Sequence, residues 1–444
     1  MAPPPPAAES RPRLADLARD RRFLVLLALG FSAGVPLPLT AFTLRQWFAE
    51  SGVSLAAIGL TALIGLAYAL KFLWAPVFDA APPPLFRAWG RRRGWLATVQ
   101  PLLALAILAV GLTDPASDPA TTVALAVLVA FLSASQDVVV DAHRVELLAE
   151  REQGYGLALY VWGYRGALLA ANAGALAVAG LAGWSAAYAY AAALVGVGFA
   201  AVALSPEPPL GAEAARLARL PWAARLRGAV VEPFLDFARR PLWGPVLAFV
   251  ALFKLGEALA GTMTAPFYRD LGFTRGEVAA VGSAFGLVAA LAGALAGGWL
   301  VARLGVARAL VLTGLAQMLS NLMYVVLARA GRDLPTLWAQ VGVENATDGL
   351  ADAAFLAYLA GLTGRAYTAT GYALLSSLAA VPLRTLGASS GWLAERLGWE
   401  GFFLLTTAAA LPAMALMVFL LRAAPPPPRE AKPRGPAAAV APDG

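Results

Sequence analysis

Apolar stretches of roughly 20 residues recur along the whole sequence, and they limit the chain to one class of structure. Twelve can be distinguished, at residues 23–46, 55–77, 95–112, 120–142, 154–182, 184–204, 243–267, 277–301, 310–328, 334–362, 367–387 and 401–421. Each is long enough to cross the hydrocarbon core of a bilayer as a helix. In water, a chain that is 59% hydrophobic and 14% charged would expose large apolar patches. The sequence therefore predicts an all-α integral membrane protein with twelve transmembrane helices.

The distribution of Lys and Arg predicts the orientation of these helices. With the N-terminus in the cytoplasm, 24 of the 34 basic residues fall on the cytoplasmic side, six, including Arg45, on the opposite side and four within spans. Cytoplasmic loops carry an excess of Lys and Arg, so we expect both termini in the cytoplasm. The same distribution attributes the net charge of +7 to membrane topology and not to nucleic-acid binding.

Composition also restricts the chemistry. The chain has no Cys and a single His, which argues against thiol catalysis and against a metal centre built from these residues. No Lys follows a Gly, so the sequence lacks a G-K-[ST] phosphate loop and ATP-driven transport by this chain alone is excluded. We expect no metal, no cofactor and no enzymatic activity.

A long basic loop divides the chain into two sets of six spans. We expect a disordered cytoplasmic tail (1–22), a six-helix bundle (23–204), a cytoplasmic linker with an amphipathic helix (205–242), a second six-helix bundle (243–421) and a disordered Pro-rich tail (422–444). Two short patterns recur between the sets. Residues 47–58 resemble 267–278 at an offset of 220, and Gly183-Trp184 recurs as Gly398-Trp399 at an offset of 215. Such repeats are typical of rocking transporters with a site between pseudo-symmetric halves; chance similarity is the alternative.

Polar and ionisable residues inside the spans are the candidate functional residues. Each charge costs about 2.5–3.5 kcal/mol at the centre of a membrane helix, so each should face a wet cavity or a partner. Spans four, five, seven and ten carry most of them. For substrate binding we single out Gln136, Tyr164, Arg165, Asn172, Lys254, Gln340 and Asn345. Arg165 and Lys254 suit anionic groups, since Arg can bind a carboxylate through two hydrogen bonds.

Carboxylates in the same spans are candidates for carrying a coupling proton, because burial favours the protonated form of an acid. They are Asp137, Asp141, Glu257, Glu344 and Asp348. Glu344, Asp348 and Asp352 follow one another at four-residue steps and so share one helix face. The alternative for Lys254 with Glu257, and for Asp141 with Arg144, is a purely structural pair within one helix.

Charged turns after spans two and eight occupy equivalent places in the two halves. Together with the end of span four they supply candidate gating residues, Asp79, Arg91, Arg92, Arg144, Arg303 and Arg308. Such a turn can pair with carboxylates in one conformation and lose them in the other. Anchoring of the helices at the inner face is the alternative.

Several segments, taken in order, carry a family resemblance. They are 30–39 (GFSAGVPLPL), 70–76 (LKFLWAP) with Asp79, 90–95 (GRRRGW), 132–146 (LSASQDVVVDAHRVE), 253–257 (FKLGE) with 266–268 (PFY), Glu344-Asn345 and 369–377 (ATGYALLSS). The chain resembles the AmpG muropeptide permease family of the major facilitator superfamily. The resemblance implies two pseudo-symmetric six-helix bundles and proton-driven import of N-acetylglucosaminyl-1,6-anhydro-N-acetylmuramyl peptides for cell-wall recycling. It places the chain in the inner membrane of a Gram-negative bacterium, with an anionic glycopeptide and protons as transported partners. We further expect contact with the bilayer and a monomeric protein.

The sequence also departs from the family pattern. Asp348 stands where relatives usually have Gly, and Asp352 stands where a small neutral residue is usual. Two extra carboxylates would disfavour an anionic cargo unless they pair with Arg165 or Arg384. Import of another cargo, such as a siderophore or an acyl-CoA, therefore stays open, as does a membrane sensor or scaffold that does not transport.

Overall fold

The computed structural model describes residues 20–148, 152–209, 242–362 and 380–423 except 382, with a few single positions between 221 and 239. Ten helical segments of this part are long and apolar enough to cross a membrane. They are Arg21–Glu50, Leu55–Leu73, Arg91–Gly111, Pro119–Leu147, Leu159–Ala182, Trp184–Leu204, Trp243–Asp270, Arg275–Leu304, Val306–Ala330 and Ser390–Ala423. The expected all-α membrane fold is confirmed.

The tenth expected span is present as α22 (Leu334–Leu362), a helix of 29 residues that carries the three carboxylates Glu344, Asp348 and Asp352. Most of the expected eleventh span falls outside the described residues, as do nearly all of the two tails and most of the linker with its expected amphipathic helix.

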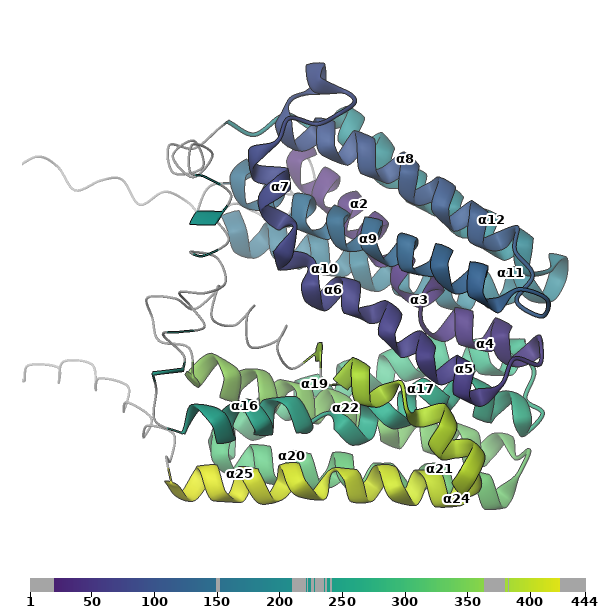
Figure 1. The fold of residues 1–444 in the computed structure, drawn as a ribbon. Helices are drawn as coiled ribbons and strands as arrows, with labels where there is room; N and C mark the ends of the chain where they lie inside the picture. The colour runs from purple at the N-terminus through teal and green to yellow at the C-terminus, as the bar shows by residue number, and fades with distance from the viewer. Residues whose placement is uncertain are drawn as a thin grey trace, which may run out of the picture.

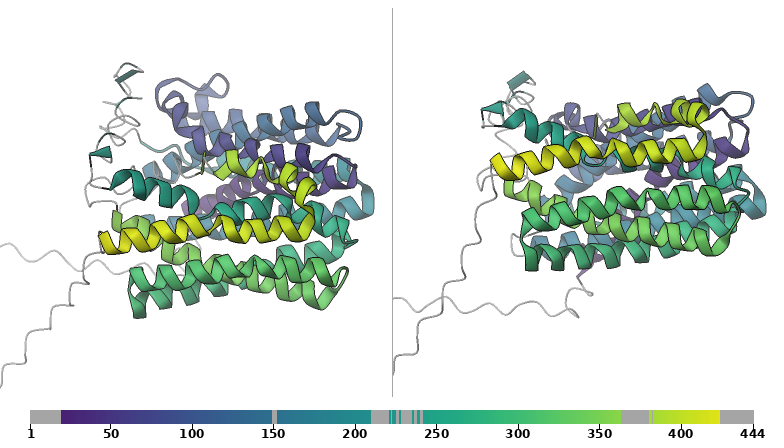
Figure 2. Two further views of the ribbon diagram at one scale, coloured as in Figure 1. Left: turned by 60° about the horizontal axis from the view of Figure 1, so that its bottom comes forward. Right: turned by 90° about the horizontal axis from the view of Figure 1, so that it is seen from below.

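The helices form two groups in space. The first contains α2 (Arg21–Gly34), α3 (Pro36–Leu39), α4 (Phe42–Glu50), α5 (Leu55–Leu60), α6 (Leu66–Leu70), α7 (Ala75–Ala80), α8 (Arg91–Gly111), α9 (Pro119–Leu147), α10 (Gln153–Leu169), α11 (Ala175–Ala182) and α12 (Trp184–Leu204). The second contains α16 (Trp243–Leu252), α17 (Leu255–Asp270), α18 (Arg275–Val278), α19 (Gly286–Leu304), α20 (Val306–Ser320), α21 (Leu322–Ala330), α22, α24 (Ser390–Ala409) and α25 (Leu411–Ala423). We call these groups the first and second halves. Figure 2 shows that the long helices of both halves run in roughly one common direction.

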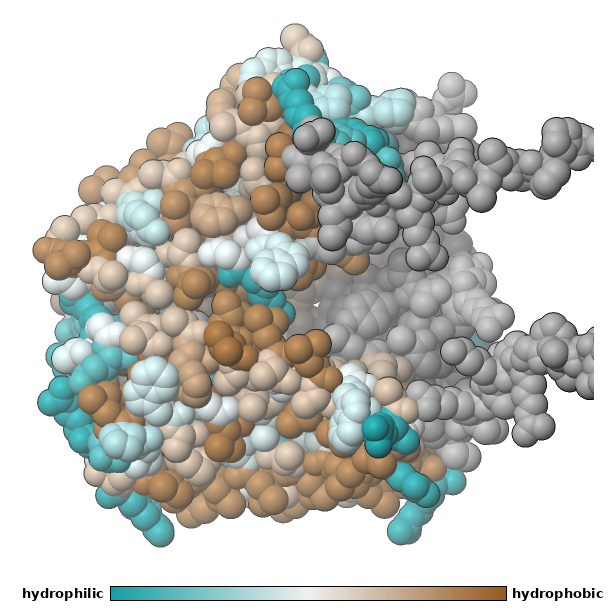
Figure 3. Space-filling view, turned by 180° about the vertical axis from the view of Figure 1, so that it is seen from behind, coloured by the Kyte–Doolittle hydropathy of each residue, from teal (hydrophilic) through white to brown (hydrophobic). Residues whose placement is uncertain are grey.

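Among the described helices, the main contacts between the two halves lie at one end. There α4 and α5 contact α17, α5 contacts α24, and α11 contacts α18. The ribbons diverge towards the other end, where α2 begins and α25 ends (Figure 1). We call these the closed end and the open end. The outer surface of both halves is mainly hydrophobic, and hydrophilic residues gather at the closed end and in the seam between the halves (Figure 3). This distribution suits a protein surrounded by lipid.

The repeated sequence pattern forms the same turn in each half. Gly52 and Gly272 adopt φ values of 73° and 86°, a left-handed conformation that favours glycine. Ser54 and Thr274 then cap the next helix, each accepting a hydrogen bond from the backbone N–H three residues on, at 3.3 Å in both cases. Local sequence thus ends α4 and α17 in equivalent ways.

Close helix contacts orient the helices that carry the candidate site. A Cβ atom on Gly30 of α2 would lie 2.1 Å from the Tyr160 carbonyl oxygen of α10, and one on Gly293 of α19 would lie 2.0 Å from the Ala346 carbonyl oxygen of α22. Small residues permit such close approach of helices in membranes. The α22 carboxylates Asp348 and Asp352 contact Lys254 at the start of α17. Asp333 caps the start of α22, and hydrogen bonds from Thr336 hold the pKa of this carboxyl below its ordinary value.

Candidate functional site

Lys254 is the centre of a charged cluster between α17 and α22. The residue lies at the break between α16 and α17, directly before the first residue of α17. Its Nζ lies 2.6 Å from Glu257 Oε2 and 2.8 Å from Asp352 Oδ1, and it also contacts Asp348 Oδ1. The pair expected within one helix is therefore part of a group of four residues from two helices. One cation faces three carboxylates, so the group carries excess negative charge when all are ionised.

Arg165 faces this cluster from the first half. It is exposed on α10, and its positive charge acts on the Asp352 carboxylate across the space between the halves. The neighbouring Tyr164 is half-buried, with its ring 6.3 Å from that of Tyr160. Asn172 lies further along, in a π-helical segment (Ala170–Gly174), and accepts a hydrogen bond of 3.1 Å from Thr43.

A cavity of about 420 Å³ adjoins the Lys254 cluster and is bounded by both halves. Arg45 and Ala62 line it from the first half, and Lys254, Glu257, Asp352 and Arg384 are among the lining residues of the second half. The sequence singled out neither Arg45 nor Arg384 as a binding residue. The distribution of Lys and Arg even placed Arg45 on the side opposite the cytoplasm, because the residue stands near the end of the first expected span.

A second polar group lies inside the second half and contains Gln340 and Glu344. Tyr268 donates a hydrogen bond of 2.6 Å to Gln340 Oε1, and Gln340 Nε2 donates one of 3.0 Å to Glu344 Oε2. Gln340 is fully buried. Glu344 thus accepts a hydrogen bond from a neutral side chain, whereas Asp348, one turn later, pairs with the cation Lys254. Asn345 donates to the carbonyl oxygen of Val341 at 2.9 Å, a bond within its own helix.

The candidate residues of α9 lie in the first half. Asp137 Oδ2 is 3.7 Å from Lys71 Nζ, a cation of the second span, and Asp137 Oδ1 is buried without a hydrogen-bond partner among the described atoms. Gln136 is fully buried and accepts a bond of 3.4 Å from Ser32. Asp141 is half exposed and lies 3.7 Å from Arg144 on the same helix. The bond from Ser32 of α2 places Gln136 between α2 and α9, and Gln136 is not among the residues that line the cavity described above.

The candidate gating residues lie towards the open end. Arg91 and Arg92 both pair with Glu146, at 2.9 and 2.6 Å. Arg303 stacks over Trp299 of its own helix at 4.9 Å, and Arg308 is exposed. Nothing is described of the Asp79 side chain. In the described residues, the ion pairs at this end join parts of the first half only.

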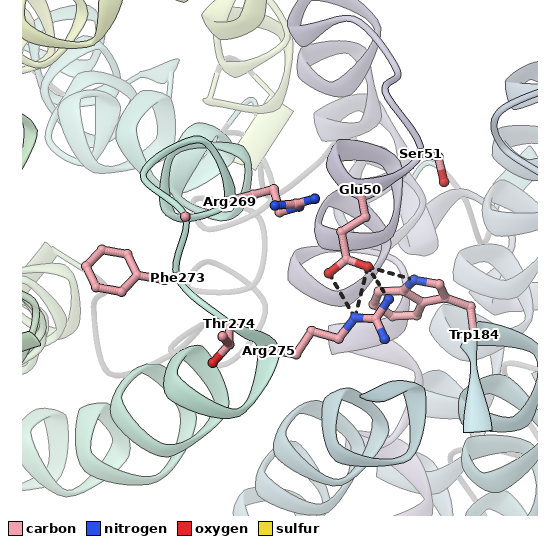
Figure 4. Close-up of a pocket in the computed structure, with 8 residues that line it drawn as sticks. Glu50, Ser51, Trp184, Arg269, Phe273, Thr274 and Arg275 are labelled. Carbon is pink, nitrogen blue, oxygen red and sulfur yellow. Dashed lines mark hydrogen bonds and ion pairs between the residues drawn. The ribbon is translucent and has the colours of Figure 1, made fainter. Parts of the chain in front are cut away.

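The ion pair that joins the two halves lies at the closed end. Arg275 Nε donates to both carboxylate oxygens of Glu50 at 2.9 Å, and Trp184 Nε1 donates to Glu50 Oε2 at 3.0 Å (Figure 4). Arg275 also donates to the Ala179 carbonyl oxygen at 2.6 Å and lies over the Trp184 ring at 5.0 Å. These residues line a surface pocket of about 470 Å³. The sequence analysis did not single out Glu50 or Arg275.

One sequence signal could have indicated Glu50. The offset of 220 pairs it with Asp270, and the offset of 215 pairs Trp184 with Trp399. Trp399 Nε1 donates to Asp270 Oδ2 at 2.6 Å, so each half contains an equivalent tryptophan–carboxylate bond. Arg275, which binds Glu50 from the other half, has no equivalent arginine in the first half. The equivalent position there, at the offset of 220, is Leu55.

Comparisons with known proteins decide the family. The chain is 40% identical over 387 residues to the anhydromuropeptide permease of Escherichia coli (strain K12), which covers 87% of this chain and 77% of that protein. It is 33% identical over 397 residues to the transporter AmpG 4 of Rickettsia conorii, covering 89% and 95% of the two chains. This chain belongs to the AmpG family. The Major Facilitator Superfamily model matches residues 251–442, and the Acetyl-coenzyme A transporter 1 model matches residues 22–118.

Solved structures place this AmpG-family chain in a known fold. The nucleoside transporter NupG superimposes with a TM-score of 0.67 at 14% identity, covering 90% of this chain and 99% of NupG. The D-xylose–proton symporter gives a TM-score of 0.65 at 12% identity, covering 89% and 96%. The expected major facilitator fold is confirmed, and the chain is a multi-pass membrane transporter of this superfamily.

Proposed function

We propose that this protein imports anhydromuropeptides across the bacterial inner membrane together with protons, by alternating access and as a monomer. The observation that carries the cargo assignment is the 40% identity to the E. coli anhydromuropeptide permease over most of the chain. A charged cavity between the halves supports the transport mechanism, because substrate sites of such transporters lie at the interface of the repeats.

The Lys254 cluster offers a way to couple protons to cargo. Lys254 is held by three carboxylates, so an anionic cargo must compete with them for the cation. Protonation of Glu257 or Asp348 removes one competitor and lowers the excess negative charge near the cavity. A proton and an anionic cargo therefore favour each other's binding, which is the linkage that symport requires. The other candidates, Asp137, Asp141 and Glu344, lie outside this cluster.

The orientation follows from the excess of basic residues in the loops assigned to the inner face. With both termini in the cytoplasm, the closed end of the molecule faces the periplasm and the open end faces the cytoplasm. The structure then corresponds to an inward-facing state, with Glu50 and Arg275 closing the periplasmic side.

Uptake of radiolabelled anhydromuropeptide in a bacterial strain that lacks its own permease tests the proposal. We expect the chain to restore uptake, and we expect a protonophore to abolish it. Uptake that persists with the protonophore would remove proton coupling. Binding without uptake would instead support a sensor or scaffold.

The match of residues 22–118 to the Acetyl-coenzyme A transporter 1 model favours an acyl-CoA as the second cargo to test. Competition in the same assay distinguishes the two cargoes. Unlabelled acetyl-CoA should leave muropeptide uptake unchanged, whereas inhibition by acetyl-CoA or by a siderophore would reverse the cargo assignment.

A further inference from the structure

Within the described residues, two arginines in the cavity between the halves, Arg45 and Arg384, have no acidic partner. Arg45 is 6% exposed, and its hydrogen bonds go to uncharged acceptors, the Thr61 hydroxyl at 3.1 Å and the Gly261 carbonyl oxygen at 3.3 Å. The charge of Arg384 repels that of Arg45. Both residues line the same cavity of about 420 Å³.

The two guanidinium groups come from opposite halves and reach across the interface. Arg45 belongs to α4 in the first half and donates a hydrogen bond to the Gly261 carbonyl oxygen of α17 in the second. Arg384 belongs to the helical turn 383–387 of the second half and lies against Gly65 of the first, where an added Cβ would be 2.5 Å from Arg384 Nε. Any side chain at position 65 would therefore displace Arg384 from the cavity wall.

Such an arrangement is unfavourable unless an anion completes it. A buried charge without a partner loses its hydration with no compensating attraction, and two like charges repel in addition. The contrast with Lys254 is informative, because that cation of the same cavity is surrounded by carboxylates. The cavity is thus lined by two arginines, Arg45 and Arg384, and by the carboxylates Glu257 and Asp352 that pair with Lys254.

We infer that Arg45 and Arg384 together form an oxyanion site that binds a carboxylate of the transported solute. The inference rests on the proposed function for the identity of the solute, and it moves the recognition of its acidic group from Lys254 to the arginine pair. Guanidinium groups bind carboxylates through paired, charge-assisted hydrogen bonds. Sugar hydroxyls, amides or an ammonium group of the solute then face Glu257 and Asp352, which accept hydrogen bonds.

Binding of two matched ligands to the purified full-length protein tests the site. One ligand is N-acetylglucosaminyl-1,6-anhydro-N-acetylmuramyl peptide with free carboxylates, and the other is the same molecule with its carboxylates amidated. Wild-type protein should prefer the acid by about ten- to a hundredfold, the range expected for hydrogen bonds to a charged group. In Arg384→Gln and Arg45→Gln this preference should fall towards one.

Arg269→Gln is the matched control. Arg269 is an exposed arginine that lines the two surface pockets of the closed end, of about 470 and 420 Å³, and not this cavity. Its removal should leave the preference for the acid unchanged. Retention of the wild-type preference in both Arg384→Gln and Arg45→Gln would overturn the inference.

Thermal unfolding separates this role from a structural one. Without ligand, Arg384→Gln should melt at the wild-type temperature or higher, because the substitution removes a buried repulsion. A lower melting temperature together with an unchanged acid preference would indicate a structural role and would count against the site.

A simple dicarboxylate separates failure of the site from failure of the cargo assignment. Succinate, compared with chloride at equal ionic strength, should raise the melting temperature of the wild type but not that of Arg384→Gln. If the muropeptide does not bind while succinate still gives this difference, the cargo is wrong and the oxyanion site stands. If succinate gives no shift and the muropeptide shows no acid preference, the site is wrong.

Discussion

Glu50 and Arg275 join the two halves of the molecule through hydrogen bonds from one guanidinium nitrogen to both oxygens of one carboxylate (Figure 4). The pair lies at the closed end, and Trp184 covers one side of it. Since α4 and α18 belong to different halves, any opening of this end must separate the two charges. The free-energy difference between the state with this end closed and the state with it open therefore depends on this contact.

Glu50→Gln should shift the protein towards opening of the closed end. The substitution removes charge-assisted hydrogen bonds, and a change of about 1–2 kcal/mol corresponds to a five- to thirtyfold change in population. The chain has no Cys, so Ala62→Cys in the cavity provides a single reporter. Its labelling by a membrane-impermeant maleimide from the closed-end side should become faster in Glu50→Gln.

Asp270→Asn is the control for this experiment. Asp270 is the equivalent carboxylate of the second half, and its bond to Trp399 stays within that half. Its substitution should change the labelling rate much less than Glu50→Gln does. Equal acceleration by both variants would show that the cross-half pair has no special role.

Lys254→Gln should destabilise the protein and abolish uptake. Loss of one partner from a fully buried ionic group costs about 3–5 kcal/mol, and the cost here is smaller because the side chains of the three carboxylates are 28% to 50% exposed. Adding Asp348→Asn should recover part of the melting temperature, because it removes one of the repelling charges, but it should not recover uptake. A single variant that melts like the wild type would contradict the cluster as described.

Arg165→Ala should abolish uptake while leaving the amount of protein in the membrane unchanged. Arg165 is exposed, and its charge acts on Asp352 in the other half, so its loss changes the charge near the Lys254 cluster and little of the packing. Substitutions at exposed positions usually alter stability by less than about 0.5 kcal/mol. Arg396→Ala, which removes an arginine stacked on Trp392 at 4.3 Å, should retain uptake. Wild-type uptake in Arg165→Ala would remove this residue from the site.

Gly293→Ala should weaken the protein through helix packing alone. The added methyl group would lie 2.0 Å from the Ala346 carbonyl oxygen, so α19 and α22 must separate at a cost of about 1–3 kcal/mol. Gly298→Ala on the same helix meets nothing within 4 Å and should be neutral or slightly stabilising, since Ala favours helix more than Gly. Melting temperatures in detergent should differ accordingly; similar values for the two variants would refute the close contact.

The sequence predicted the parts of the structure that depend on local pattern. Bilayer thickness sets the length of each apolar stretch, and the four-residue spacing of Glu344, Asp348 and Asp352 follows from helix geometry. The repeated turns at Gly52 and Gly272 could also be found, because glycine there adopts a positive φ. These features need no knowledge of how the helices pack.

Pairings between distant segments could not be predicted in the same way. Lys254 was expected to bind an anionic cargo, yet the packing of α22 against α17 gives it carboxylates of the protein itself. Arg45 was counted with the residues outside the membrane. In the structure the first span is interrupted between α3 and α4, and the Arg45 side chain lines the cavity. Both outcomes depend on the relative position of the two halves, which charge counts and helical periodicity do not contain.

The equivalent turns of the two halves have not kept equal roles. Each supplies a tryptophan-bound acid, but Glu50 alone of the two holds a cross-half arginine in the described residues. A duplicated ancestor with two matching acids would have had no built-in preference between them. This asymmetry makes the two directions of the transport cycle energetically unequal. The closed end opens only when the hydrogen bonds of Arg275 to the first half break together.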